Sequence, residues 1–220
     1  MPRRMPRFDR QLAHQAQLAI GLVRAGEASR INGGHAGRTD WTIARLEALH
    51  EFAYLRVFAA WETCLEAIFF RSLCGYASGA GQETLLTGPH FPSLAAAETA
   101  ALAAEGPGFQ FLLWHSPWKV ITRCRRFIQS GLPHCHAVQE TVMASSSTRL
   151  SHLSHIRHRI VHDQEDAKRK FDTATQQFSG RTYPASRPGR FLRDWTTSVP
   201  RQRWLDVAVN ELVSLAAQMV

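Results

Sequence analysis

The stretch from Phe52 to Leu73 limits most strongly what this chain can fold into, because it is apolar on nearly all sides. Its spacing predicts a helix over residues 41 to 74 rather than a strand. A helix of this kind lies at the centre of a bundle, with other helices around it. Charged residues keep the stretch short of the roughly 18 uninterrupted apolar residues of a membrane span; they are Arg56, Glu62, Glu66 and Arg71.

The other segments also predict helices, and none has the alternating pattern of a strand. Residues 1 to 36 are expected to form an N-terminal helix, over 8 to 29, and a glycine-rich flexible turn. Further helices are expected over residues 93 to 104, 117 to 129, 148 to 170 and 201 to 219. The expected fold class is all-α, with one helical domain over residues 1 to 220 and a core of four to five helices.

Residues 172 to 199 are rich in glycine, proline and serine, which predicts a long irregular loop before the C-terminal helix. Basic and aromatic residues are interleaved there, which suits single-stranded nucleic acid through phosphate pairing and base stacking. We therefore expect Arg181, Arg190 and Arg193 to contact RNA. The alternative is that the aromatic side chains pack back onto the bundle, and it is favoured for at least half of them.

The charge and the cysteines indicate the class of partner and the compartment. A formal net charge of +8 favours a polyanionic partner, with nucleic acid first and a membrane surface second. The amino end lacks the apolar run of a signal peptide, and the four cysteines form no CxxC pair. A cytoplasmic protein with buried, reduced thiols and no membrane segment is expected. No P-loop, GxSxG or Rossmann glycine pattern is present, so no cofactor is predicted.

The residues that carry chemistry gather on the helix expected over 148 to 170, around the sequence Arg-His-Arg-Ile-Val-His at 157 to 162. On a helical wheel Arg157 falls within the apolar stripe. A guanidinium keeps its proton and costs several kcal/mol when it is buried alone. Arg157 therefore needs an acidic partner, a phosphate or a neighbouring subunit. Glu62 on the central helix is the candidate partner, although a partly solvated Glu62 is equally open.

A second stripe of the same helix carries Ser151, His155, His158 and His162. Arg157 and His162 lie about 140° apart on an ideal helix, so they converge more easily when two chains pack along it. This geometry favours a homodimer joined through the motif helix.

The segment from Arg157 to His162 resembles the R-x4-6-H motif of the HEPN superfamily, in which a polar residue often follows the arginine. The resemblance extends over residues 40 to 215 but rests mainly on this motif. It implies a dimeric helical bundle with two motifs in one cleft, Arg157 as the motif arginine, His158 as the polar residue and His162 as the motif histidine. Many members are metal-independent endoribonucleases of toxin–antitoxin, phage-defence or CRISPR-associated systems. An antitoxin or regulatory protein is thus an implied partner. One subgroup has a tyrosine that its antitoxin modifies, where this chain has Gln164.

The residue types fit RNA cleavage without appeal to the family. A base near neutral pH takes the 2′-OH proton, an acid protonates the leaving 5′-oxygen, and histidine titrates in that range. A fixed arginine stabilises the charge of the phosphorane. The expected products are 2′,3′-cyclic phosphate and 5′-OH ends, with Glu62 as an auxiliary residue of the site.

Three other interpretations stay open. A metal site is one, since histidines at i and i+4 bind zinc, although HExxH and zinc-finger spacings are absent. Its ligands would come from His152, His155, His158, His162 and Asp163, with His134, Cys135 and His136 upstream. The second is a non-catalytic helical module that binds RNA or protein through residues 117 to 129 and the arginine-rich loop. The third leaves the histidines merely solvated.

Overall fold

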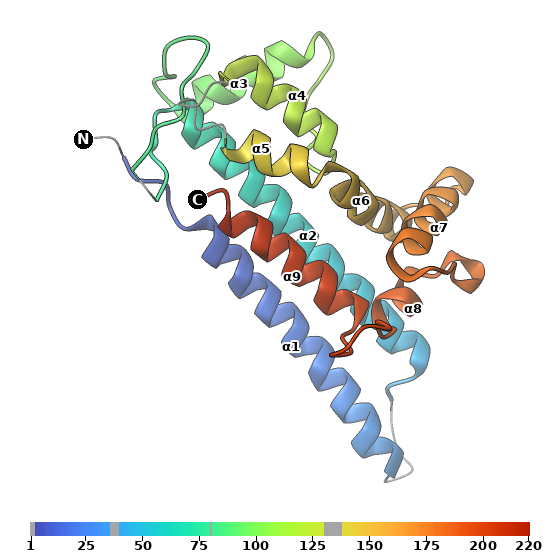
Figure 1. The fold of residues 1–220 in the computed structure, drawn as a ribbon. Coiled ribbons are helices and arrows are strands. Elements are labelled where there is room, and N and C mark those ends of the chain that lie inside the picture. Colours follow the sequence, from blue (N-terminus) through green and yellow to red (C-terminus); the bar gives the residue numbers. More distant parts are fainter. Residues whose placement is uncertain (1–2, 36–39, 80, 130–137) are drawn as a thin grey trace. The chain divides into compact units, whose positions relative to one another are not determined.

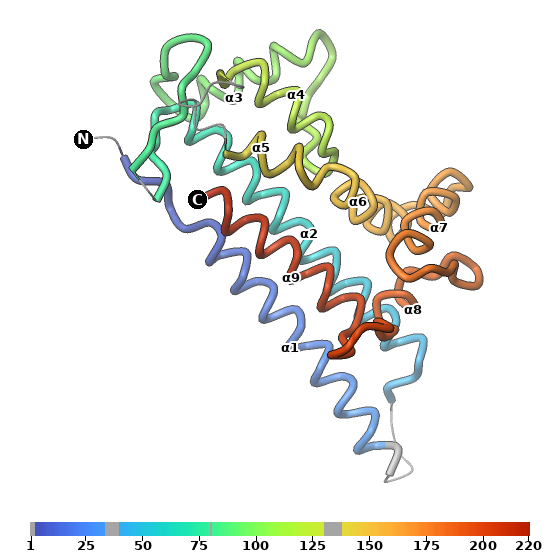
Figure 2. The backbone as a smooth tube through the Cα atoms, in the orientation of Figure 1, coloured from blue at the N-terminus to red at the C-terminus, as the bar shows by residue number. Residues whose placement is uncertain are grey.

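A computed structural model describes residues 3–35, 40–79, 81–129 and 138–220 (Figures 1 and 2). Within these residues the secondary structure is helical, and β-type pairing is limited to isolated bridges. The predicted all-α class is confirmed. In the described part of the chain no helix is both long and apolar enough to cross a membrane.

The helices follow the chain in the order drawn in Figure 1. Their bounds are α1 Phe8–His35, α2 Ile43–Leu73, α3 Leu94–Glu105, α4 Pro117–Phe127, α5 Val138–Ser145, α6 Ser147–Val161, α7 Glu165–Ser179, the 3-10 helix η1 Pro184–Ser186, α8 Pro188–Arg193 and α9 Trp204–Ala217. The chain divides into two compact units, which are described separately. The first unit comprises Met1–Gln11, Trp61–Leu150 and Ser214–Val220, and the second comprises Leu12–Ala60 and Ser151–Val213.

The expected central helix is α2, and its apolar side chains supply core to each unit. Tyr54 and Val57 are fully buried in the second unit, as are Leu65 and Phe69 in the first. Each such side chain contributes about 1.5–3 kcal/mol through its burial. Phe52 is an exception to the apolar pattern, because 69% of it is exposed.

In the first unit, the basic helix α4 is fixed by carboxylates and an aromatic ring. Arg123 donates to Glu105 at 2.9 Å, and its guanidinium lies 4.5 Å from the ring centre of Trp114. Arg125 pairs with Glu140 on α5 at 2.8 Å. The basic side of this helix is therefore largely engaged within the protein.

Two boundaries in the second unit differ from the prediction. The first helix continues through residues 30–35, where a turn was expected, and residues 36–39 of that turn lie outside the described part. The helix expected over 148 to 170 is instead two helices, α6 and α7. Arg159 holds the turn between them, because its guanidinium donates to the His162 carbonyl at 3.1 Å and pairs with Asp163 at 2.7 Å. Glu165 and Asp166 then start α7, where acidic residues suit the helix dipole.

The prediction of a long irregular loop over residues 172 to 199 is wrong for much of that segment, which is partly helical. α7 continues to Ser179 because its apolar face, including Phe171, is buried, and α8 begins at Pro188, where a missing N–H costs nothing. At Gly189 a Cβ atom would collide with the Glu47 backbone oxygen, so glycine lets α8 approach α2 closely. The Gly189 N–H donates to Glu51 on α2 at 2.7 Å.

Three of the four aromatic residues in this segment pack back onto the second unit, as the alternative interpretation expected. Tyr183 and Phe191 are buried, and Phe191 stacks on Trp204 of α9 with ring centres 5.5 Å apart. Phe178 is half-buried, whereas Trp195 is 47% exposed.

Candidate functional site

The histidines of α6 form a row in the second unit, the histidine row, which consists of His152, His155, His158 and His162. The ring centres of His158 and His162 are 4.6 Å apart, and those of His152 and His155 are 6.2 Å apart. His162 follows the last residue of α6, but its N–H still donates to the His158 carbonyl at 2.9 Å. This extra turn brings the two rings together.

Helix α7 faces the histidine row and sets its electrostatics. Burial lowers the pKa of His158, and the neighbouring charges of His162, Lys170 and Arg157 lower it further, while Asp166 opposes them. His158 is therefore neutral near pH 7 and able to accept a proton. Lys170 and Asp166 belong to α7, and they form an ion pair at 2.6 Å. The helical wheel treated this stripe as free to meet a second chain, whereas α7 of the same chain lies near it.

His155, in the middle of the row, is also kept neutral. Burial, then His152 and Lys170, lower its pKa. Its Nδ1 atom is buried and has no hydrogen-bond partner among the described residues. A neutral imidazole is the form that tolerates such a position.

The motif arginine and the acidic partner predicted for it lie in different units. Arg157 is half-buried in the last turn of α6, in the second unit, and its charge reaches His158. Glu62 is half-buried on α2, in the first unit. The ion pair between Glu62 and Arg157 therefore stays a prediction.

Arg159 is a residue of this region whose role the sequence did not indicate. Its side chain is only 12% exposed, and its Nε donates to the Ser186 carbonyl of η1 at 3.1 Å. Ser186 and Ala185 have positive φ angles of 45° and 56°, a conformation that is uncommon outside glycine. Asp172 also accepts from the Ser186 hydroxyl at 2.9 Å. Arg159 thus ties the end of α6 to the turn before α8.

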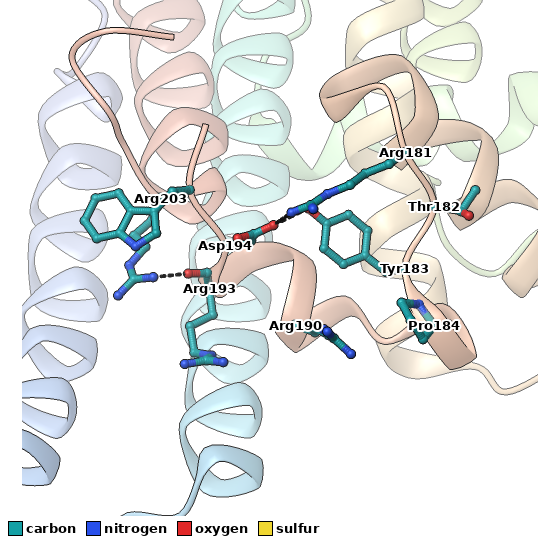
Figure 3. Close-up of a pocket in the computed structure, with 9 residues that line it drawn as sticks. Arg181, Thr182, Tyr183, Pro184, Arg190, Arg193, Asp194 and Arg203 are labelled. Carbon is teal, nitrogen blue, oxygen red and sulfur yellow. Dashed lines mark hydrogen bonds and ion pairs between the residues drawn. The ribbon is translucent and has the colours of Figure 1, made fainter. Parts of the chain in front are cut away.

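The second feature of the unit is a cavity of about 570 Å³ that we call the arginine pocket (Figure 3). All three arginines predicted to contact RNA line it, together with Arg203, which the sequence did not single out. The remaining lining residues are Thr182, Tyr183, Pro184, Asp194 and Trp195. Residues from three segments, after α7, on α8 and before α9, therefore meet at one site.

The arginines of this pocket differ in their partners. Arg181 pairs with Asp194, which also accepts from the Tyr183 hydroxyl at 2.7 Å (Figure 3). Arg203 pairs with Glu27 of α1 at 2.9 Å, donates to the Arg193 carbonyl and lies 4.0 Å from the ring centre of Trp195.

Arg190 and Arg193 have neither a carboxylate nor a hydrogen-bond acceptor for their side chains among the described residues. Arg190 is exposed, whereas Arg193 is half-buried and its Nε is fully buried. These two cations are the part of the pocket that a ligand would find unneutralised.

In the described part of the chain, no group of three or more histidine, cysteine or acidic side chains is arranged so that it could hold a metal ion. His134, Cys135 and His136, which the metal interpretation included, lie outside those residues. Cys64 and Cys124 are buried free thiols, and burial raises the pKa of each to about 12. Cys74 is only half-buried, so the expectation of buried thiols does not hold for it.

No family model, curated protein or solved structure matches this chain. The likeness to the HEPN superfamily therefore rests on the motif residues themselves. Function is inferred below from the histidine row and the arginine pocket.

Proposed function

We propose that this chain is a metal-independent endoribonuclease of the HEPN type, acting as a toxin or antiviral defence effector. The observation that supports this function is the pair of imidazole rings at the end of α6, with centres 4.6 Å apart. Arg157 lies within electrostatic reach of His158. Two imidazoles and a guanidinium are the groups that cleavage through the 2′-oxygen requires.

Each residue has a distinct part in the proposed reaction. His158, which is neutral near pH 7, accepts the proton of the 2′-OH as its oxygen attacks the adjacent phosphorus. Arg157 stabilises the negative charge that builds on the phosphorane oxygens. His162 donates a proton to the leaving 5′-oxygen as the phosphorus–oxygen bond breaks. The products are a 2′,3′-cyclic phosphate and a 5′-hydroxyl.

A homodimer through α6 belongs to the proposal, because a second copy would bring a second motif to the same RNA. The arginine pocket supports RNA as the substrate, since Arg190 and Arg193 offer unneutralised charge to a phosphate group. An antitoxin or other regulatory protein would be a further partner.

The test uses purified full-length protein, total RNA and EDTA. Replacing either His158 or His162 with alanine is expected to slow cleavage by about 10²–10⁴-fold, the contribution of one general acid or base. His14→Ala is the matched control, because His14 is exposed on α1 and outside the histidine row. Equal cleavage by the wild type and both histidine variants would refute the assignment.

A non-catalytic RNA-binding module is the second candidate function. The two unneutralised arginines of the pocket favour it, because they bind phosphate without any chemistry at the histidines. RNA binding by a wild-type protein that cuts nothing, with affinity unchanged in His162→Ala, would favour this function over cleavage.

A further inference from the structure

The arginine pocket has a surplus of positive charge that can be counted. Four arginines line it, and the carboxylates paired with them are Asp194 and Glu27. Four positive charges minus two negative charges leave a surplus of +2. Each carboxylate is already engaged, Asp194 by Arg181 and Glu27 by Arg203.

The surplus lies on Arg190 and Arg193, which α8 presents to the same cavity. In Figure 3 neither side chain carries a contact to another residue of the pocket. The Nε of Arg193 is buried without an acceptor, and a buried donor left in this state is destabilising. Only the Nε is buried in this way, so the terminal nitrogens of both guanidiniums are left for an anion in the cavity.

Contacts with α2 hold α8 in place, although the charge of Arg193 on α8 opposes that of Arg203. The Gly189 N–H donates to Glu51, and Arg187 pairs with Glu47, so α8 is fixed to α2 at its first turn. Burial lowers the pKa of Arg203, and the charge of Arg193 lowers it further. The contacts with α2 thus hold α8 where the positive charge of Arg193 acts against that of Arg203.

An aromatic surface borders the charged groups. Trp195 lines the cavity and is 47% exposed, and Arg203 lies over its ring. An exposed indole is a stacking surface for a nucleobase. The volume of about 570 Å³ lies within the range of small-ligand sites.

We infer that the arginine pocket binds the phosphate monoester of a nucleotide, either as a free nucleotide or as the phosphorylated end of an RNA strand. A monoester carries about two negative charges at neutral pH and so matches the surplus of +2, whereas a phosphodiester within a strand carries one. Arg190 and Arg193 contact the phosphate oxygens, and the base lies against Trp195. This site is separate from the histidine row and does not depend on RNA cleavage.

Calorimetry on the full-length protein tests this inference with adenosine 5′-monophosphate, adenosine 3′-monophosphate, adenosine and inorganic phosphate as probes. A monophosphate is expected to bind at least about tenfold more tightly than adenosine, because charge-assisted hydrogen bonds are lost with the phosphate. Arg190→Gln and Arg193→Gln should each weaken monophosphate binding by about tenfold or more. Arg169→Gln on α7 is the control, since Arg169 is an exposed arginine paired with Asp166 outside the pocket.

A second arm separates the two sources of the phosphate. RNA oligonucleotides with a 5′-phosphate, a 3′-phosphate or neither end phosphorylated are titrated into His162→Ala, so that the strand stays intact. Tighter binding of one phosphorylated end, lost in Arg190→Gln, would support capture of a strand end. Binding of the free monophosphate alone would assign the pocket to a nucleotide.

Two results would overturn the inference. One is equal affinity for adenosine and its monophosphates, and the other is unchanged monophosphate binding in Arg190→Gln. Arg190 is exposed and has no structural partner among the described residues, so its variant is expected to fold. Equal binding of all three oligonucleotides, with the arginine variants still weaker, would assign the pocket to internal phosphates instead.

Discussion

The arginines of α4 and those of the arginine pocket differ in how they are matched by acidic groups. On α4, Arg123 and Arg125 each have a carboxylate within 2.9 Å, from Glu105 and Glu140. On α8, Arg190 and Arg193 have none among the described residues. Arg193 is half-buried, between the buried Arg123 and the exposed Arg125 in its accessibility.

The difference shows that the arginines behind the net charge of +8 do not all have the same role. Arginines matched by carboxylates stabilise the fold and offer little to a polyanion. Unmatched arginines in a cavity cost stability and are kept where a ligand compensates them. The predicted RNA surface over residues 117 to 129 is therefore a weaker candidate than the pocket, although both are rich in arginine.

The largest expected effect is on the stability of the first unit. Arg123 is 2% exposed, so Arg123→Ala leaves Glu105 without its buried partner and Trp114 without its cation. Breaking such a pair is expected to lower the free energy of unfolding by about 3–5 kcal/mol, measured by urea denaturation. Arg125→Ala is the control, because the Arg125 side chain is 55% exposed and such pairs contribute about 0–1 kcal/mol. Similar losses in both variants would contradict the distinction.

Replacing an arginine of the pocket is expected to change the free energy of unfolding in the opposite direction. Arg193→Met removes a cation whose Nε is buried without an acceptor and keeps much of its apolar volume. The free energy of unfolding should stay the same or rise by about 0.5–2 kcal/mol, as is common when a residue is kept for function at a cost in stability. Denaturation of this variant beside Arg123→Ala measures the contrast directly. A loss as large as that of Arg123→Ala would make Arg193 a structural residue.

The salt dependence of RNA binding gives a smaller but cleaner difference. For single strands, the slope of log affinity against log salt concentration changes by roughly 0.7 for each phosphate contact. Arg190→Gln and Arg193→Gln should each flatten the slope by that amount, as read from fluorescence anisotropy at several salt concentrations. Arg125→Gln on α4 should leave it unchanged. A flatter slope in the α4 variant would place RNA on that helix as well.

The smallest effect concerns His50, a buried residue of α2 near the pocket. Burial lowers its pKa from 6.5, Arg203 and Arg193 lower it further, and Glu27 and the Leu46 carbonyl oppose them. Just below pH 6.5, His50 therefore binds a proton in the unfolded chain but stays neutral in the folded chain. Stability is full above about pH 6.5 and falls as the pH drops toward the folded pKa.

Urea denaturation between pH 5 and 7.5 measures this loss, which His50→Gln should reduce. Arg193→Met should reduce it too, because it removes one of the charges that hold His50 neutral. An unchanged acid profile in Arg193→Met would mean that the pocket charges do not reach His50.

Much of the fold follows from the apolar pattern, and less of the site does. The apolar stretch around Phe58 and Phe69 predicted α2 to within a few residues, since burial on every side leaves few alternatives. The loop was mispredicted because the glycines and prolines of residues 172 to 199 outweighed a buried helical face at the start of that segment, which includes Ala174. Gly189 and Pro188 belong to α8 rather than to a flexible segment.

Composition alone brought Arg181, Arg190 and Arg193 together as one basic group, and the structure places them in one pocket. Arg203 was not predicted from the sequence, because its place in the pocket depends on contacts with α1 and the Arg193 backbone. Arg159 was missed for the same reason, since its partner Ser186 is 27 residues away. Long-range hydrogen bonds leave no periodic trace in a sequence.

The most direct test of the central claim is the chemistry of the RNA ends that the protein produces in EDTA. Attack by the 2′-oxygen, with His158 as base and His162 as acid, predicts fragments that carry 5′-hydroxyls and 2′,3′-cyclic phosphates. Such fragments accept a labelled phosphate at the 5′ end without prior phosphatase treatment, and His162→Ala yields none of them. Fragments with 5′-phosphates and free 3′-hydroxyls, or identical fragments from His162→Ala, would contradict the proposed reaction.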